Sequence, residues 1–150
     1  MAKPVIAYAN DSRYFSSVRI ELLEGLGFEV KFCQHAKEVL EQFETTVAQK
    51  PVILVTDMRL THDEELCPMR TRGALDTGMA LWKILRARNH GDLNVIIYTT
   101  SKTNFERLCE RKDSRMFPIY DCDPDSTEQI IKTVRGLKPL PTQEVGEPSR

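Results

Sequence analysis

Residues 52–57 read Val-Ile-Leu-Val-Thr-Asp, four aliphatic side chains followed by a threonine and an acid. Strands that are almost wholly aliphatic are typical of parallel sheets, because helices cover both faces of such sheets. This run therefore predicts a buried parallel strand. Asp57 stands at its carboxyl end, where the chain leaves the strand.

Similar short apolar runs lie on both sides of this strand. They cover residues 5–9, 28–33, 95–98 and 117–122, and Pro118 in the last, weaker run favours an edge position. Longer segments with the spacing of amphipathic helices follow the runs. Five strand–helix units in this order predict one α/β domain, a doubly wound parallel sheet with helices on both faces.

The helical segments are marked by apolar residues that recur every three or four positions. Phe15, Val18, Leu22 and Leu26 fall on one helix face, and Gly27 is a stop signal. The later helices are indicated by Val39, Leu40 and Phe43, by Leu81, Ile84 and Leu85 after Gly78, by Phe105 and Leu108, and by Ile130, Ile131, Val134 and Leu137 with Asp125 or Ser126 as cap. Residues 1–137 are expected to form the domain, and residues 138–150, with their prolines, a flexible tail.

Composition excludes several classes of protein. The 150 residues carry 21 basic and 22 acidic side chains, a balance that argues against a nucleic-acid-binding domain. No apolar run is long enough to span a membrane, and the first residues lack the apolar stretch of a signal peptide. We therefore expect a cytoplasmic protein without nucleic-acid or membrane partners.

The cysteines and histidines do not have the spacing of a zinc site. The chain has no Cys-x-x-Cys pair, and its three histidines do not complete a ligand set with the cysteines. These residues are Cys33, Cys67, Cys109, Cys122, His35, His62 and His90. In a cytoplasmic protein we expect the cysteines to be reduced.

The candidate site follows from the fold. In an open parallel sheet the ligand lies beyond the carboxyl ends of the strands, where the strand order reverses. The residues at the predicted strand ends are Asn10-Asp11, Asp57, Thr99 and Asp123.

These positions resemble those of the receiver domain of two-component response regulators, a flavodoxin-like fold of the chemotaxis-regulator type. Asn10-Asp11 stands where receivers usually have two acids, and the Gly-Phe-Glu-Val run at 27–30 is similar to the start of their second strand. Residues 52–60 look like the phosphoacceptor strand and the start of its loop. Asp76-Thr77-Gly78 is similar to the aspartate-x-glycine opening of the third helix.

The end of the chain continues this resemblance, which covers about residues 3–137. Residues 95–100 are similar to the receiver strand that ends in a hydroxyl residue and a small one. Tyr120 lies three residues before Asp123-Pro124, where the family has its switch aromatic and a Lys-Pro pair. No single motif is specific, but together their order and spacing are.

The resemblance implies a phosphoacceptor signalling domain rather than an enzyme, although such a domain can catalyse its own phosphotransfer. Asp57 would accept a phosphoryl group from a histidine kinase or phosphotransfer protein as an acyl phosphate. Mg²⁺ would be held by Asp11, Asp57, the backbone carbonyl of Arg59 and, through water, Asn10. The Thr99 hydroxyl would bind a phosphoryl oxygen, and Tyr120 would move with it to change the surface that a downstream protein target reads.

Two substitutions depart from the family pattern. Asn10 replaces an acid, which weakens the metal site without abolishing it. Asp123 replaces the lysine that pairs with the phosphoryl group, and such a pair is worth about 4 kcal/mol at an effective dielectric constant of 20. A clean two-state switch needs roughly 5.5 kcal/mol of differential affinity between its two states. The lost lysine–phosphoryl attraction is therefore comparable with the whole energy of switching. With Asp11 and Asp57, Asp123 would instead form an acidic cluster that raises carboxylate pKa values and binds a divalent cation.

The third departure is an insertion at residues 61–75, between the third strand and the third helix. Its charged residues are Asp63, Glu64, Glu65, Arg70 and Arg72, which form either a solvated loop or part of the site. One of these arginines, or Lys102 after the fourth strand, is a candidate for the missing cation.

Other readings of these residues stay open. Asp11 can simply cap a helix, Thr99 can be a strand former, and Tyr120 can pack in the last strand. With no output domain after Leu137, we expect a stand-alone receiver that signals by protein contact. The main alternative is a pseudo-receiver, a binding module without phosphorylation. A Mg²⁺-dependent phosphohydrolase is disfavoured because Arg59 stands where the commonest such enzymes have a second acid.

Overall fold

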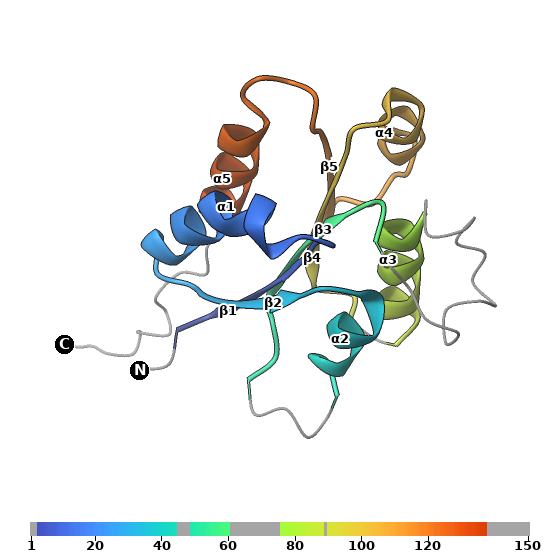
Figure 1. Ribbon diagram of the computed structural model, residues 1–150. Coiled ribbons are helices and arrows are strands. Elements are labelled where there is room, and N and C mark those ends of the chain that lie inside the picture. The colour runs from blue at the N-terminus through green and yellow to red at the C-terminus, as the bar shows by residue number, and fades with distance from the viewer. Residues whose placement is uncertain (1–2, 45–48, 61–75, 89, 138–150) are drawn as a thin grey trace.

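The computed structural model describes residues 3–44, 49–60, 76–88 and 90–137, in which strands and helices alternate along the chain (Figure 1). The strands are β1 (Val5–Ala9), β2 (Glu29–Cys33), β3 (Ile53–Asp57), β4 (Asn94–Thr99) and β5 (Met116–Tyr120). The helices are α1 (Arg13–Gly25), α2 (Ala36–Glu41), α3 (Thr77–Ala87), α4 (Lys102–Cys109) and α5 (Ser126–Leu137).

The strands form one parallel sheet in the order β2-β1-β3-β4-β5. The helices lie on both faces, with α1 and α5 on one side and α2, α3 and α4 on the other (Figure 1). The predicted doubly wound sheet is therefore confirmed, and β5, which contains Pro118, is an edge strand as predicted. The strand order reverses between β1 and β3, so the carboxyl ends of these two strands mark the expected ligand site.

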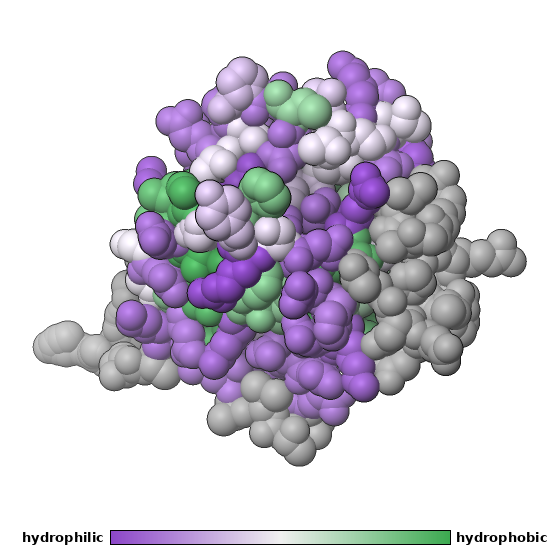
Figure 2. All heavy atoms as spheres, viewed as in Figure 1, coloured by the Kyte–Doolittle hydropathy of each residue, from purple (hydrophilic) through white to green (hydrophobic). Residues whose placement is uncertain are grey.

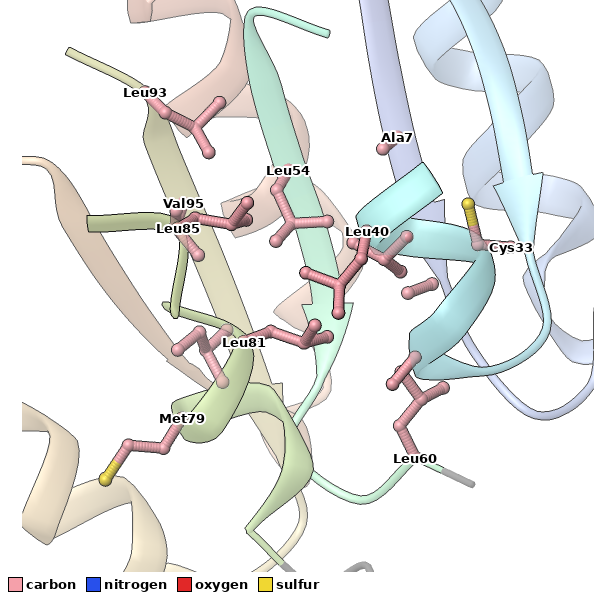
Figure 3. Close-up of a cluster of buried hydrophobic side chains, with 14 of the residues drawn as sticks. Ala7, Cys33, Leu40, Leu54, Leu60, Met79, Leu81, Leu85, Leu93 and Val95 are labelled. Atoms are coloured by element: carbon pink, nitrogen blue, oxygen red, sulfur yellow. The ribbon is translucent and has the colours of Figure 1, made fainter. Parts of the chain in front are cut away.

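A hydrophobic core lies on each face of the sheet, and side chains of β3 point alternately into the two. Both kinds of position in this strand are therefore aliphatic. Leu54 packs with Leu40 of α2 and with Leu81 and Leu85 of α3, as Figure 3 shows. Its neighbours in the strand point to the other face, where they pack against α1 and α5. The polar end of the strand, Thr56 and Asp57, belongs to β3 as well, so the strand continues further than its aliphatic run indicates.

The sequence pattern located α1 but did not identify its buried face. Phe15, Val18 and Leu22 do lie on one helix face, yet that face is exposed, at 80%, 62% and 45% respectively. The buried residues are Ser16, Ile20 and Leu23, which repeat with the same helical period. Both faces satisfy the spacing rule, and packing against the sheet selected the one that contains a serine.

The last helix agrees with its prediction. Ile130 and Val134 are buried under the sheet, and Ile131 and Leu137 pack at the edge of the same core. The predicted insertion at 61–75 and tail at 138–150 lie outside the described residues. Within the described ranges, no helix combines the length and apolar character needed to cross a bilayer.

Candidate functional site

Asp57 is the last residue of β3 and pairs in register with Tyr98 of β4. Its side chain is half-buried, and two weak hydrogen bonds hold it. The Arg59 backbone N–H donates to Oδ1 at 3.2 Å, and the Asn10 amide Nδ2 donates to Oδ2 at 3.4 Å. The carboxylate thus lies at the carboxyl ends of β1 and β3, where the strand order reverses, which is the predicted position for a ligand.

The surroundings of Asp57 disfavour its negative charge. Burial raises the pKa of Asp57 to about 7, and the Arg59 N–H opposes this rise. The negative charges of Asp11 and Asp121 raise the pKa further. The acid at the end of β3 is therefore disposed to take up a proton or a cation near neutral pH.

Asn10 follows β1 and fixes the geometry beside Asp57. Its Oδ1 accepts a hydrogen bond from the Ser12 backbone N–H at 2.8 Å. Because that N–H can only donate, the amide nitrogen of Asn10 must face the other way. It donates to the Tyr98 hydroxyl at 2.7 Å and to Asp57. An aspartate in this position could not donate either bond, so Asn10 does more than weaken an acid pair.

Behind Asn10 lies a polar network that the sequence analysis missed. The Tyr98 hydroxyl donates to the Ala9 carbonyl at 3.4 Å, and the guanidinium of Arg19 lies over the Tyr98 ring, 5.1 Å from its centre. Arg19 forms an ion pair with Asp121 at 2.6 Å, and the Ser126 hydroxyl donates to the same carboxylate at 2.6 Å. The network therefore connects the vicinity of Asp57 with α1 and the start of α5.

Asp121, rather than Asp123, is the acid after β5 that acts on Asp57. Asp123 is exposed, and its carboxylate accepts a hydrogen bond from Gln129 of α5 at 3.5 Å. Its backbone carbonyl accepts from the Ser126 N–H at 3.0 Å, so Asp123 lies in the turn that leads into α5. The charges that act on Asp57 are thus those of Asp11 and Asp121, so the acidic cluster of Asp11, Asp57 and Asp123 predicted from the sequence is wrong in its third member.

Thr99 ends β4, one residue beyond the partner of Asp57, and is only 2% exposed. Its hydroxyl oxygen accepts the Ser101 backbone N–H at 3.0 Å. Its carbonyl accepts the Asp121 N–H at 2.7 Å. In this structure the hydroxyl of Thr99 therefore stabilises the turn that leads from β4 into α4.

Tyr120 lies opposite Thr99 at the end of β5 and is half-exposed. Its ring packs against Phe105 of α4, with the ring centres 5.7 Å apart. The ammonium of Lys102 lies 5.8 Å from the centre of the Tyr120 ring. Lys102, a candidate for the missing cation, is thus engaged with the predicted switch residue. The candidate arginines at 70 and 72 lie outside the described residues.

The residues around Asp57 include oxygen donors of the kind that Mg²⁺ takes. Asp11 and Asp57 supply two carboxylates that repel each other, and the Arg59 carbonyl supplies a neutral oxygen. Magnesium usually binds through one or two carboxylates and keeps several waters, which this set satisfies. Among the described ranges, no group of three His, Cys, Asp or Glu side chains is placed to bind a metal.

Gly78 explains the Asp76-Thr77-Gly78 motif. Its N–H donates to the Met58 carbonyl at 2.9 Å, which brings the start of α3 against the end of β3. A Cβ at this position would lie 2.7 Å from the backbone oxygen of Asp57 and 3.0 Å from Met58 Cα. Only glycine allows this approach, so the residue shapes the backbone that carries Asp57.

Comparison with known proteins supports the fold. No protein-family model matches the chain, and neither does any curated protein sequence. Solved structures, in contrast, do match the chain. The Francisella response regulator 1452 receiver domain superposes with a TM-score of 0.63 at 21% identity, over 90% of this chain and 96% of that one.

Two further structures agree. A CheY-like receiver domain protein from Methanospirillum hungatei gives a TM-score of 0.61 at 16% identity, over 91% of this chain and 94% of its own. The non-phosphorylated HemR receiver domain from Leptospira biflexa gives a TM-score of 0.61 at 18% identity, over 92% of this chain and 96% of its own. The chain described here therefore has the fold of response regulator receiver domains.

Proposed function

We propose that this chain is a receiver domain that accepts a phosphoryl group on Asp57. The observation that supports this most strongly is the position of that carboxylate. It is half-buried at the carboxyl end of β3, where the strand order reverses, in a fold shared with receiver domains. Its partners at 3.2 and 3.4 Å are weak enough to leave it available as a nucleophile.

The chemistry is a single phosphoryl transfer. An oxygen of Asp57 forms a bond to phosphorus while the bond from phosphorus to the donor breaks. In a kinase or phosphotransfer protein the leaving group is a histidine imidazole. Only the ionised carboxylate attacks, and with a pKa of about 7 a large part of Asp57 is ionised at neutral pH.

Magnesium is the cofactor that this site would take. It would be held by the carboxylates of Asp11 and Asp57, by the Arg59 carbonyl and, through water, by Asn10. When bound, it would supply positive charge for the phosphoryl oxygens. The remaining work falls to this chain: Asn10 orients Asp57, and Gly78 keeps α3 against the backbone that carries it.

The second candidate is a pseudo-receiver that binds a protein partner without phosphorylation. The specific observation in its favour is the charge around Asp57, because Asp11 and Asp121 both oppose the negative charge of a bound phosphoryl group. Arg19 cannot offset this charge readily, since it is already paired with Asp121 at 2.6 Å. Asp123, which stands where receivers have lysine, adds another acid to this end of the sheet.

Intact-mass spectrometry separates these functions. The protein is incubated with acetyl phosphate and Mg²⁺, and we expect the mass of one phosphoryl group to be added. Asp57→Asn should prevent the addition, whereas Asp92→Asn, at an exposed acid in the turn before β4, should not. No addition with any small phosphodonor would favour the pseudo-receiver, and steady release of phosphate from simple esters would favour a phosphohydrolase.

A further inference from the structure

Tyr98 is a buried tyrosine beside the candidate site, and the phosphoryl transfer described above gives it no role. It is only 2% exposed, and its backbone pairs in register with Asp57 of β3. The preceding residues of β4, at 95–97, are all aliphatic. The Tyr98 hydroxyl accepts the Asn10 amide Nδ2 at 2.7 Å, a shorter hydrogen bond than that side chain makes with Ser12 or Asp57. Because a buried hydroxyl costs free energy unless it is hydrogen-bonded, this contact is what a tyrosine provides here and a phenylalanine would not.

The ring of Tyr98 is held from both β1 and α1. The ring of Tyr8 packs against it, with the ring centres 6.1 Å apart. Helix α1 exposes apolar side chains to solvent (Figure 2), but it directs Arg19 inward, and the Arg19 guanidinium lies 5.1 Å from the centre of the Tyr98 ring. The hydroxyl also donates to the Ala9 carbonyl at 3.4 Å. The phenol oxygen is therefore a well-fixed acceptor next to Asn10.

The amide of Asn10 needs such a fixed acceptor. The last torsion of an asparagine side chain is broad, so rotamer preference alone does not set the plane of the amide. Two hydrogen bonds set it here: the Ser12 N–H binds Oδ1 at 2.8 Å, and the Tyr98 hydroxyl binds Nδ2 at 2.7 Å. The amide nitrogen has two hydrogens in fixed directions. With one of them directed to Tyr98, the other is left for Oδ2 of Asp57, at 3.4 Å.

We infer that Tyr98 is a positioning residue for phosphoryl transfer to Asp57, an inference that rests on the proposed function. Tyr98 acts through Asn10: its hydroxyl fixes the amide, and the amide then binds one carboxylate oxygen of Asp57 while the Arg59 N–H binds the other. One donor on each oxygen sets the plane of the carboxylate, and hence the direction from which an oxygen meets phosphorus. A displacement of about 1 Å in a reacting group can cost about a hundredfold in rate. Because the bond from Asn10 to Asp57 is weak, we expect loss of the Tyr98 hydroxyl to cost about tenfold.

The rate of phosphorylation by acetyl phosphate and Mg²⁺, followed by intact mass, measures this role. Tyr98→Phe keeps the ring and removes only the hydroxyl, and it should react about tenfold more slowly than the wild type. Tyr8→Phe is the matched control. It removes an equally buried hydroxyl, for which the described residues provide no hydrogen-bond partner, and it should leave the rate unchanged. In Asn10→Ala the Tyr98 hydroxyl has no amide to hold, so adding Tyr98→Phe should slow that variant no further.

The side-chain amide resonances of Asn10 report the contact in the absence of any phosphodonor. A hydrogen bond moves the resonance of its proton downfield. Tyr98→Phe should therefore shift one Asn10 amide proton upfield, and since the aromatic ring is kept, the shift reports the lost hydroxyl. Tyr8→Phe should leave both amide protons in place.

Two kinds of result would overturn the role of Tyr98 while the proposed function stands. One is an Asn10 amide that does not respond to Tyr98→Phe. The other is a rate for Tyr98→Phe that equals the wild-type rate, or a double variant with Asn10→Ala that is slower than Asn10→Ala alone. A wild-type chain that takes up no phosphoryl group on Asp57 would instead overturn the proposed function, and the role of Tyr98 with it, even if the amide resonance shifts.

Discussion

Replacing Asp57 with asparagine should stabilise the folded protein at neutral and alkaline pH. In the folded state the pKa of Asp57 is raised to about 7 by burial and by Asp11 and Asp121, against an ordinary value of 3.8. The folded protein therefore binds more protons than the unfolded chain between these two values. Its free energy of unfolding falls as the pH rises through that window, and the full cost is present above about pH 7.

The magnitude follows from the size of the shift. Each pKa unit corresponds to 1.36 kcal/mol, so a shift of about three units sets an upper limit of about 4 kcal/mol. Solvent still screens this half-buried carboxylate in part, and we therefore expect Asp57→Asn to add about 2 kcal/mol at pH 8. Asparagine keeps an oxygen for the Arg59 N–H and loses only the weaker bond, at 3.4 Å, that Oδ2 accepts from Asn10. The gain should shrink toward zero below about pH 3, where Asp57 is neutral in both the folded and the unfolded state.

Urea denaturation at several pH values measures this effect. The single tryptophan, Trp82 of α3, packs at the edge of one hydrophobic core and reports unfolding by fluorescence. Asp92→Asn is the control and should not reproduce the pH dependence. A gain from Asp57→Asn that is absent at pH 8, or that is the same at pH 5 and pH 8, would refute the electrostatic account of the site.

Three other perturbations give distinct outcomes. Millimolar Mg²⁺ should raise the melting temperature of the wild type but not of Asp57→Asn or Asp11→Ala, because the cation offsets repulsion between these two carboxylates; an equal shift in all three proteins would place the metal elsewhere. Gly78→Ala should lower the free energy of unfolding by about 2 kcal/mol or more and slow phosphorylation, because its Cβ would lie 2.7 Å from the backbone oxygen of Asp57. Gly91→Ala is the control: a Cβ there has no atom within 4 Å, so both measurements should be nearly unchanged. Arg19→Ala should cost about 3 kcal/mol because it leaves the half-buried Asp121 unpaired, and much of the loss should return in the double variant with Asp121→Ala; a fully additive double variant would contradict the ion pair.

The sheet was predictable because its signals are local. The apolar runs in β1, β3 and β4 are short and uninterrupted, and segments with the spacing of amphipathic helices lie between them. This alternation is enough to predict the strands and their parallel arrangement. The buried face of α1 was not predictable in this way. The exposed set at 15, 18 and 22 is more apolar than the buried set at 16, 20 and 23, so hydropathy alone selects the wrong face.

The candidate site, too, could be predicted only where its signals are local in the sequence. Asp57 could be located from sequence because it directly follows an aliphatic strand. The bond from Asn10 to the Tyr98 hydroxyl joins residues 88 positions apart, and only the packing of β1 near β4 reveals it. The difference between Asp121 and Asp123 depends on the turn after Tyr120, which directs one carboxylate to Arg19 and the other to Gln129. Two acids in one short turn carry no local signal that distinguishes these directions.

Chemical mapping can identify the residue that carries the phosphoryl group. The chain is treated with acetyl phosphate and Mg²⁺, reduced with borohydride, which converts an aspartyl phosphate to homoserine, and mapped by peptide mass spectrometry. If Asp57 is the phosphoacceptor, homoserine appears at position 57 and aspartate stays unmodified at positions 11, 121 and 123. Conversion at one of those other positions, or at none, would contradict it.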